Sequence, residues 1–281
     1  MSETAPQTTI LVTGATGNVG RPLVEQLLAA GHRVRALTRD PAKANLPAGA
    51  EAVAGDLADT ASLAAAFEGV GAAHLIGFDA ADFAPLANGA EIVDLAVGAG
   101  VRKVTVLRGD VTRGPLEEAV VASGLEWTEL APVEFMSNVL EWAESVRTEG
   151  VVRDAFPEAR SALVHEADIA AVAATALTTD GHAGAEYWLT GPEALTHPEK
   201  VRAIGEALGR EVRYVELTRD EIVARWRAEG WSEPDIEFFL AMRTDPPAAG
   251  ATVLPTVERV TGRPARTFAQ WARENAAAFG G

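Results

Sequence analysis

Residues 9–20 read TILVTGATGNVG, an apolar, largely β-branched run that leads directly into three closely spaced glycines. The run predicts a strand, and the apolar spacing after it predicts a helix. In such a unit Gly14 permits the tight turn, Gly17 leaves room for a pyrophosphate, and Gly20 lets the helix pack closely on the strand. The expected contacts of a bound dinucleotide are Gly14, Thr16, Gly17, Asn18, Val19 and Gly20.

Up to Pro132 the chain alternates strand-like and helix-like segments. Strands are predicted at residues 9–13, 33–38, 51–54, 72–76, 103–107 and 126–130, with helical spacing of the apolar residues between most of them. Regular β–α alternation of this kind predicts an α/β fold of the Rossmann type, with a doubly wound parallel sheet and helices on both of its faces.

After Pro132 the alternation weakens, and several later helices begin at capping boxes led by Thr196, Thr218 and Thr267. We therefore expect a smaller, mainly helical C-terminal lobe that binds the substrate. The predicted division is a dinucleotide-binding domain over residues 8–150 and a substrate lobe over residues 151–281. Some elements of the lobe are expected to return to the sheet, and both parts are expected to form one compact unit.

The second predicted strand indicates which dinucleotide binds. NAD-binding proteins usually end this strand with an acidic residue that holds the ribose 2′-hydroxyl. Here Thr38 stands at that place, and Arg39 and Lys43 follow it. Both cations can pair with a 2′-phosphate, so NADP(H) is the expected cofactor. The alternative is that they are ordinary exposed cations of a surface loop.

A further polar segment follows the third predicted strand. The side chain of Asp56 and the backbone amide of Leu57 are placed to meet the edge of an adenine ring. Alternatively, Asp56 caps a helix that starts near Thr60. Both roles are compatible with the sequence.

Composition excludes several other functions. The formal charge is −16, from 24 basic and 40 acidic side chains, which disfavours direct binding to nucleic acid or anionic membranes. The chain has no cysteine, and its five histidines are scattered, so no metal site is expected. Residues 1–9 are polar and predict a short tail rather than a signal peptide. We expect a cytoplasmic protein with no membrane span.

Seven short motifs together resemble the NmrA-like group of atypical short-chain dehydrogenase/reductases. They are TGATGNVG (13–20), RDP (39–41), GDL (55–57), SGLEWT (123–128), PVEFMSN (132–138), HEADIA (165–170) and YWLTGP (187–192). The resemblance spans residues 9–217. It implies a Rossmann-type fold that binds NAD(P)H, in a group that includes quinone reductases, atypical ketoreductases and redox-sensing regulators.

The chain lacks the catalytic pair of the wider superfamily, a tyrosine followed four residues later by a lysine. The only tyrosines are Tyr187 and Tyr214, and the residues four further on are Gly191 and Thr218. The weak candidates for a catalytic role are Glu134 and Asn138, on the loop after the sixth predicted strand, which in relatives passes the nicotinamide.

Two further side chains have open roles. Glu134 could be a protonated acid, or it could form a salt bridge with Arg108. His165 is expected to support the start of a helix or to make an interior hydrogen bond.

Two functions are compatible with these observations. The first is an NADPH-dependent, ketoreductase-like reductase of an apolar aromatic carbonyl or quinone substrate, whose cleft is lined by one or two of the later aromatic residues. The second is a non-catalytic NADP(H)-sensing regulatory protein of the NmrA type. The expected partner of the enzyme is a small apolar aromatic molecule, and a homodimer remains open.

Overall fold

The computed structural model describes residues 8–79, 84–245 and 248–281, so most of the expected tail (Met1–Thr9) lies outside the described residues. Its internal contacts define two units. Unit 1 runs to Pro132 and includes Glu166–Leu189, and unit 2 comprises Val133–His165 and Thr190–Gly281. The chain thus passes between the units three times, whereas the predicted division was at residue 150, with some elements of the lobe returning to the sheet.

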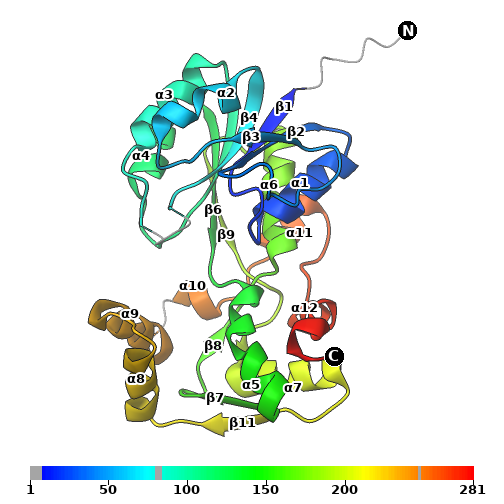
Figure 1. The fold of residues 1–281 in the computed structure, drawn as a ribbon, viewed down its shortest axis with the longest axis vertical. Helices are drawn as coiled ribbons and strands as arrows, with labels where there is room; N and C mark the ends of the chain where they lie inside the picture. The colour runs from blue at the N-terminus through cyan, green and yellow to red at the C-terminus, as the bar shows by residue number, and fades with distance from the viewer. Residues whose placement is uncertain (1–7, 80–83, 246–247) are drawn as a thin grey trace. The chain divides into compact units, whose positions relative to one another are not determined.

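Unit 1 is built on a seven-stranded sheet in which every pair of neighbouring strands is parallel (Figure 1). In spatial order the strands are β3 (Glu51–Ala54), β2 (Arg33–Thr38), β1 (Thr9–Val12), β4 (Val70–Ile76), β5 (Lys103–Leu107), β6 (Glu126–Pro132) and β9 (Ala185–Leu189). The order 3-2-1-4-5-6 confirms the predicted Rossmann-type fold, and β9 adds a seventh strand beside β6.

Helices cover both faces of this sheet (Figure 1). One face carries α1 (Gly20–Ala29) and α6 (Glu166–Thr178); the other carries α2 (Ala64–Phe67), α3 (Gly89–Gly98) and α4 (Pro115–Ala122). A short 3-10 helix, η1 (Thr60–Ser62), precedes α2. Because the inner strands are covered on both sides, their side chains are almost completely buried, as at Leu11, Val12 and Val106. The apolar runs seen in the sequence are therefore the core of unit 1.

Unit 2 is mainly helical. Its helices are η2 (Met136–Trp142), α5 (Ala143–Glu149), α7 (His197–Leu208), α8 (Arg219–Ala228), α9 (Glu233–Thr244), α10 (Ala248–Ala251), α11 (Thr256–Thr261), α12 (Phe268–Glu274) and η3 (Ala276–Phe279). Two small ladders accompany them: β8 (Arg160–Ser161) pairs antiparallel with β10 (Leu195–Thr196), and β11 (Arg213–Glu216) pairs parallel with β7 (Val151–Asp154). The capping boxes predicted at Thr196, Thr218 and Thr267 are confirmed at the starts of α7, α8 and α12.

A buried histidine makes the stability of unit 1 depend on pH. His74 lies on β4 with no exposed surface, and its Nδ1 is 2.8 Å from the Thr105 hydroxyl. Burial lowers the pKa of His74 from 6.5 to about 4. The folded state therefore resists a proton that the unfolded state accepts. For this group, the free energy of unfolding is therefore highest above pH 6.5, where both states are neutral. It decreases as the pH falls toward 4.

We predict that His74→Gln reduces the pH dependence of unfolding. For this one group the free energy of unfolding of the wild type should fall by up to about 1.4 kcal/mol per pH unit between pH 6.5 and 4. Denaturant titrations across that range should show a shallower slope in the variant. His32→Gln is the matched control, because solvent reaches His32. Equal slopes for wild type and His74→Gln would contradict the prediction.

Candidate functional site

The glycine loop joins the end of β1 to the start of α1. Gly14 has a φ of +59°, in the left-handed region that residues with a side chain avoid. The hydroxyl of Thr13 holds the loop to the neighbouring strand by accepting a hydrogen bond from the Ile76 amide at 3.1 Å. A Cβ atom on Gly20 would lie 2.1 Å from the Gly14 carbonyl oxygen. Only glycine therefore lets α1 begin this close to β1.

Gly17 is constrained differently from Gly20. Apart from its chain neighbours, a Cβ atom on Gly17 would meet only the Gly14 carbonyl oxygen, at 3.2 Å. The fold itself thus makes little demand for glycine at this position, which supports the predicted role of leaving space for a ligand. The other predicted contacts divide by burial, because the loop exposes Thr16 and Asn18 but buries Val19 and Gly20.

The helix after the loop presents a positive end. No side chain caps α1 at Val19, and its first turn contains no acidic residue. The partial positive charge of the helix N-terminus is therefore not neutralised by the helix itself. An anionic group such as a diphosphate is stabilised in this environment.

Parallel registers bring the three predicted cofactor segments to one edge of the sheet. Val12 pairs with Ala36, so the glycine loop and Thr38 extend from neighbouring strands in the same direction. Thr38 pairs in turn with Ala54, and its carbonyl accepts a hydrogen bond from the Gly55 amide at 3.1 Å. The loop, the end of β2 and the segment after β3 are thus neighbours, as the sequence predicted for a dinucleotide site.

The two cations after β2 are both exposed but differ in their contacts. The ammonium of Lys43 lies 2.9 Å from the Asp40 carboxylate. Arg39 has no hydrogen bond or ion pair to any described residue. Arg39 is therefore the freer of the two to pair with a phosphate.

The segment after β3 corrects one of the two roles considered for Asp56. Its carboxylate accepts a hydrogen bond from the Ala58 amide at 3.1 Å. Asp59 rather than Asp56 caps η1, by accepting from the Ala61 amide at 3.2 Å. The helix begins at Thr60 as predicted, but the helix-cap interpretation of Asp56 was wrong, because the capping position directly before the helix is Asp59. Leu57 is buried in the core of unit 1.

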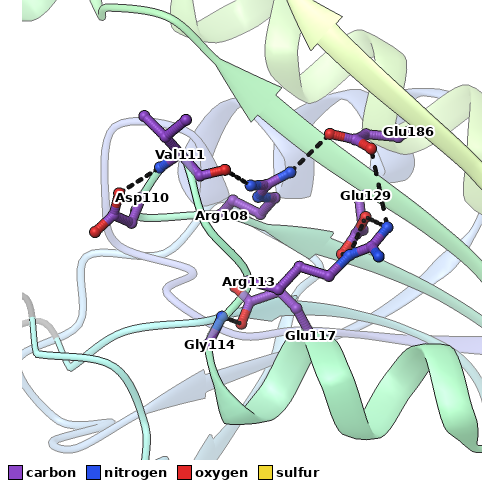
Figure 2. A network of polar contacts seen from close by, with 8 residues as sticks. All are labelled: Arg108, Asp110, Val111, Arg113, Gly114, Glu117, Glu129 and Glu186. Carbon is purple, nitrogen blue, oxygen red and sulfur yellow. Dashed lines mark hydrogen bonds and ion pairs between the residues drawn. The ribbon is translucent and has the colours of Figure 1, made fainter.

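Ion pairs hold the loop after β5 against the sheet (Figure 2). Arg108 follows β5 and is buried; its guanidinium donates to Glu186 Oε1 at 2.7 Å and also to the Val111 carbonyl. The expected alternative, a salt bridge from Arg108 to Glu134, was wrong. Arg113 donates to both carboxylate oxygens of Glu129 at 2.6–3.0 Å.

The register explains why two arginines are needed there. Glu129 on β6 and Glu186 on β9 are direct register partners, and the Glu129 side chain is completely buried. Adjacent carboxylates repel each other, and a buried one without a partner is costly. A forked guanidinium group on each carboxylate removes both costs. The loop between β5 and α4 is consequently tied to the sheet by electrostatics.

In unit 2 the structure places Glu134 beside a lysine that sequence reasoning had not considered. Glu134 Oε2 lies 3.9 Å from Lys200 Nζ, and this ammonium donates to the Ser161 hydroxyl at 2.7 Å. The other weak candidate, Asn138, is exposed in η2, and its backbone N–H donates to the Phe135 carbonyl.

Unit 2 contains a second set of polar side chains that contact one another, Asp154, His197 and Arg243. Asp154 Oδ2 lies 3.5 Å from His197 Nδ1, and the guanidinium of Arg243 contacts the His197 ring. Burial lowers the pKa of His197 to about 2, and the charges of Arg243 and Lys200 act in the same direction. His197 is therefore neutral near pH 7, and it is a weak base. No sequence signal links these residues, which come from three separate elements.

The remaining predicted side chains have structural partners. The Tyr187 hydroxyl lies 2.7 Å from His182 Nδ1, and the Tyr214 hydroxyl donates to the Asp154 carbonyl at 2.8 Å. Burial raises the pKa of Tyr214, which makes it a poorer acid. His165 Nε2 lies 3.0 Å from Glu274 Oε2; the histidine side chain is buried, but that of Glu274 is exposed, so the expected interior hydrogen bond stays a prediction.

The described residues contain neither a metal-binding cluster nor a helix that could span a membrane. Among residues 8–79, 84–245 and 248–281 there is no cluster of three or more side chains suited to a metal ion. Within the same ranges, none of the helices has the length and apolar character needed to cross a membrane.

Relatives of known name match the chain over nearly its whole length. It is 39% identical to a (4-alkanoyl-5-oxo-2,5-dihydrofuran-3-yl)methyl phosphate reductase of Streptomyces griseus, covering 96% of this chain and 99% of that one. It is 36% identical to an NAD(P)H azoreductase of Xenophilus azovorans, with the same coverage. An NADPH-dependent quinone oxidoreductase of Escherichia coli, solved with NADPH, superimposes with a TM-score of 0.77. That structure is 26% identical and covers 94% of this chain and 99% of its own.

The parallel sheet, the glycine loop and these relatives define the class of the protein, a dinucleotide-dependent oxidoreductase with a Rossmann-type fold. Residues 6–106 match the NmrA-like family, and the chain belongs to that family. The resemblance seen in the sequence motifs is thereby confirmed.

We predict that Arg39→Ala weakens the binding of NADPH but not that of NADH. A hydrogen-bonded ion pair contributes about 1.5–3 kcal/mol, so the NADPH dissociation constant should rise roughly 10- to 100-fold. Fluorescence titration with both cofactors measures this. Arg33→Ala is the matched control, because Arg33 is exposed at the opposite end of the same strand. A wild type that binds both cofactors equally would contradict the assignment.

We also predict that Gly17→Val abolishes cofactor binding in a folded protein. The branched side chain would occupy the space above the loop, while the fold has to yield only a few tenths of an ångström. Gly98→Ala is the control, since a Cβ atom on Gly98 meets no atom within 4 Å. Circular dichroism checks the fold. Undiminished binding by folded Gly17→Val would show that the loop is only a turn.

Proposed function

We propose that this NADP(H)-dependent oxidoreductase reduces small, apolar, conjugated acceptors such as aromatic ketones and quinones. The observation that carries the proposal is the edge of unit 1 where the glycine loop, the uncapped α1 and the unpaired Arg39 come together. These groups would hold the diphosphate and the 2′-phosphate of NADPH. The bound cofactor supplies hydride, and the protein supplies orientation and electrostatics.

The names of the relatives support the conjugated character of the acceptor. One is named for a dihydrofuran ring that carries oxo, alkanoyl and methyl phosphate groups, and another is an azoreductase. Conjugated acceptors spread the charge left by hydride addition, so they place less demand on a proton donor. This suits a chain that has no tyrosine followed four residues later by lysine.

The aromatic side chains of α8, of α9 and of the turn between them support an apolar substrate. Trp226 stacks on Trp231 with ring centroids 5.5 Å apart, and Phe239 meets Trp231 edge-on at 4.8 Å. Phe238 packs against Phe239 and remains 49% exposed. An exposed aromatic ring on a packed aromatic base is suited to a flat apolar molecule. The proposed setting is the cytoplasm.

The proposal is tested with a panel of quinones and aromatic ketones, following NADPH oxidation at 340 nm as the standard wavelength for this cofactor. Tyr187→Phe and Tyr214→Phe should each retain kcat within about threefold, because neither hydroxyl is placed as an acid. A positioned acid contributes about 10²–10⁴-fold, so its loss would be plain. A hundredfold loss in either variant, with folding and cofactor binding intact, would identify a tyrosine donor.

One result would contradict the proposed enzymatic function as a whole. If NADPH binds but no acceptor in the panel is reduced, the NADP(H)-sensing regulator becomes the better explanation.

A further inference from the structure

The loop that carries Arg39 and Lys43 contains no helix. This β2–β3 loop (residues 39–50) joins two strands that are parallel neighbours, and none of its residues, all of which the structure describes, is helical. A parallel crossover usually contains a helix that packs on the sheet and thereby fixes the segments on either side of it. Other contacts must therefore fix the positions of these two cations.

Hydrogen bonds close the first part of the β2–β3 loop into a turn. The backbone amides of Lys43 and Ala44 both donate to the Asp40 carbonyl, at 3.2 and 3.0 Å. Arg39 directly precedes this turn, and Asn45 directly follows it. Because the turn joins these two residues through hydrogen-bonded backbone, a contact that holds Asn45 also restricts the backbone of Arg39.

One side chain fastens this turn to α1. The guanidinium group of Arg21 donates to the backbone carbonyl of Asn45. Among residues 8–79, 84–245 and 248–281, no other hydrogen bond or ion pair joins the β2–β3 loop to an element outside the two strands that it connects. The backbone amide of Arg21 donates to the Gly17 carbonyl at 3.0 Å. Arg21 therefore connects the glycine loop to the β2–β3 loop.

The stability of α1 does not explain a cation at this position. Arg21 is the second residue of the helix, where the partial positive charge of the N-terminus disfavours a cation. The Glu25 carboxylate lies 3.4 Å from its guanidinium group, but both side chains are more than one third exposed, so this ion pair contributes little. An acidic residue in the first turn would stabilise the helix better. The contact with Asn45 is the feature that requires an arginine.

We propose that Arg21 is a positioning residue for the 2′-phosphate of NADPH, because it holds the β2–β3 loop against α1 and so keeps Arg39 in place. The inference rests on the proposed function, in which Arg39 pairs with that phosphate. The glycine loop and the N-terminus of α1 would hold the diphosphate of the same cofactor. A cation that is held in place before the phosphate binds loses less conformational entropy on binding, which strengthens the interaction.

The first test compares the two cofactors in Arg21→Met, a change that removes the donors but keeps a good helix former. The NADPH dissociation constant should rise roughly 3- to 10-fold, as for the loss of one hydrogen bond. That of NADH should stay within about twofold, because NADH has no 2′-phosphate. Arg219→Met is the matched control, since Arg219 is an exposed arginine in the first turn of α8. It should change neither dissociation constant.

A double-mutant cycle tests whether Arg21 acts through Arg39. If it does, Arg21→Met should have little further effect once Arg39 has been replaced by alanine. The double variant should then bind NADPH within about twofold of Arg39→Ala alone. Equal losses in the two backgrounds would show that Arg21 acts on the cofactor directly, and this would contradict the positioning role.

Hydrogen exchange provides a readout without any cofactor. The amides of Lys43 and Ala44 close the turn, so they are protected only while the turn is formed. In Arg21→Met both amides should exchange roughly 3- to 10-fold faster. The amides of Leu23 and Leu27 in α1 should exchange at the rate of the wild type. Unchanged exchange at Lys43 and Ala44 would contradict the proposed fastening of the turn.

The outcomes distinguish this inference from the proposed function. If Arg39→Ala binds NADPH as tightly as the wild type, the proposed pairing of Arg39 is contradicted, and the role of Arg21 with it. If Arg39→Ala loses affinity for NADPH but Arg21→Met does not, the role of Arg21 alone is contradicted. Circular dichroism and thermal unfolding establish that each variant is folded.

Discussion

The approach of α1 to the end of β1 is the contact on which the candidate site depends. The Gly14 carbonyl oxygen occupies the space where a side chain on Gly20 would begin. This contact sets the direction of α1 and so aims its uncapped N-terminus at the loop. Because β1 is also paired with both β2 and β4, the same contact fixes the loop relative to Thr38 and to Ile76. A side chain at Gly20 would push α1 away from β1. The loop and Thr38 would then still lie at the same edge of the sheet, but the N-terminus of α1 would no longer be directed at the loop.

Features encoded by neighbouring residues could be predicted from the sequence. Three strands, 33–38, 51–54 and 103–107, have the predicted bounds, because β-branched runs end at turn residues. The capping boxes were equally predictable, since a threonine and the acid or amide three residues later satisfy each other's backbone. The cofactor edge followed in turn, because parallel strands present their carboxyl ends together.

Pairs between distant residues could not be predicted in this way. Lys200 and Ser161 are 39 positions apart, and nothing near either residue specifies the other. From the sequence, a salt bridge with Arg108 was one of the two roles open for Glu134. The register of β6 and β9 decides otherwise, since it sets Glu186 beside Glu129 and thereby requires two cations. Such pairings depend on which elements become neighbours in the fold, and no residues close to either partner in the sequence specify this.

The arginines of unit 1 differ in whether they have partners, and this difference is the basis of the selectivity that we propose for Arg39. Arg35, Arg108 and Arg113 are each committed to carboxylates or carbonyls of unit 1. In a protein with a net charge of −16, any unpaired cation at an anion-binding edge has a strong local effect. Arg39 is such a cation. The same reasoning applies with the opposite result in unit 2, where Lys200 is enclosed among carboxylates and cannot serve a large anion. A cation that is exposed and unpaired is suited to binding a phosphate, whereas a buried cation that already contacts a hydroxyl and a carboxylate is not.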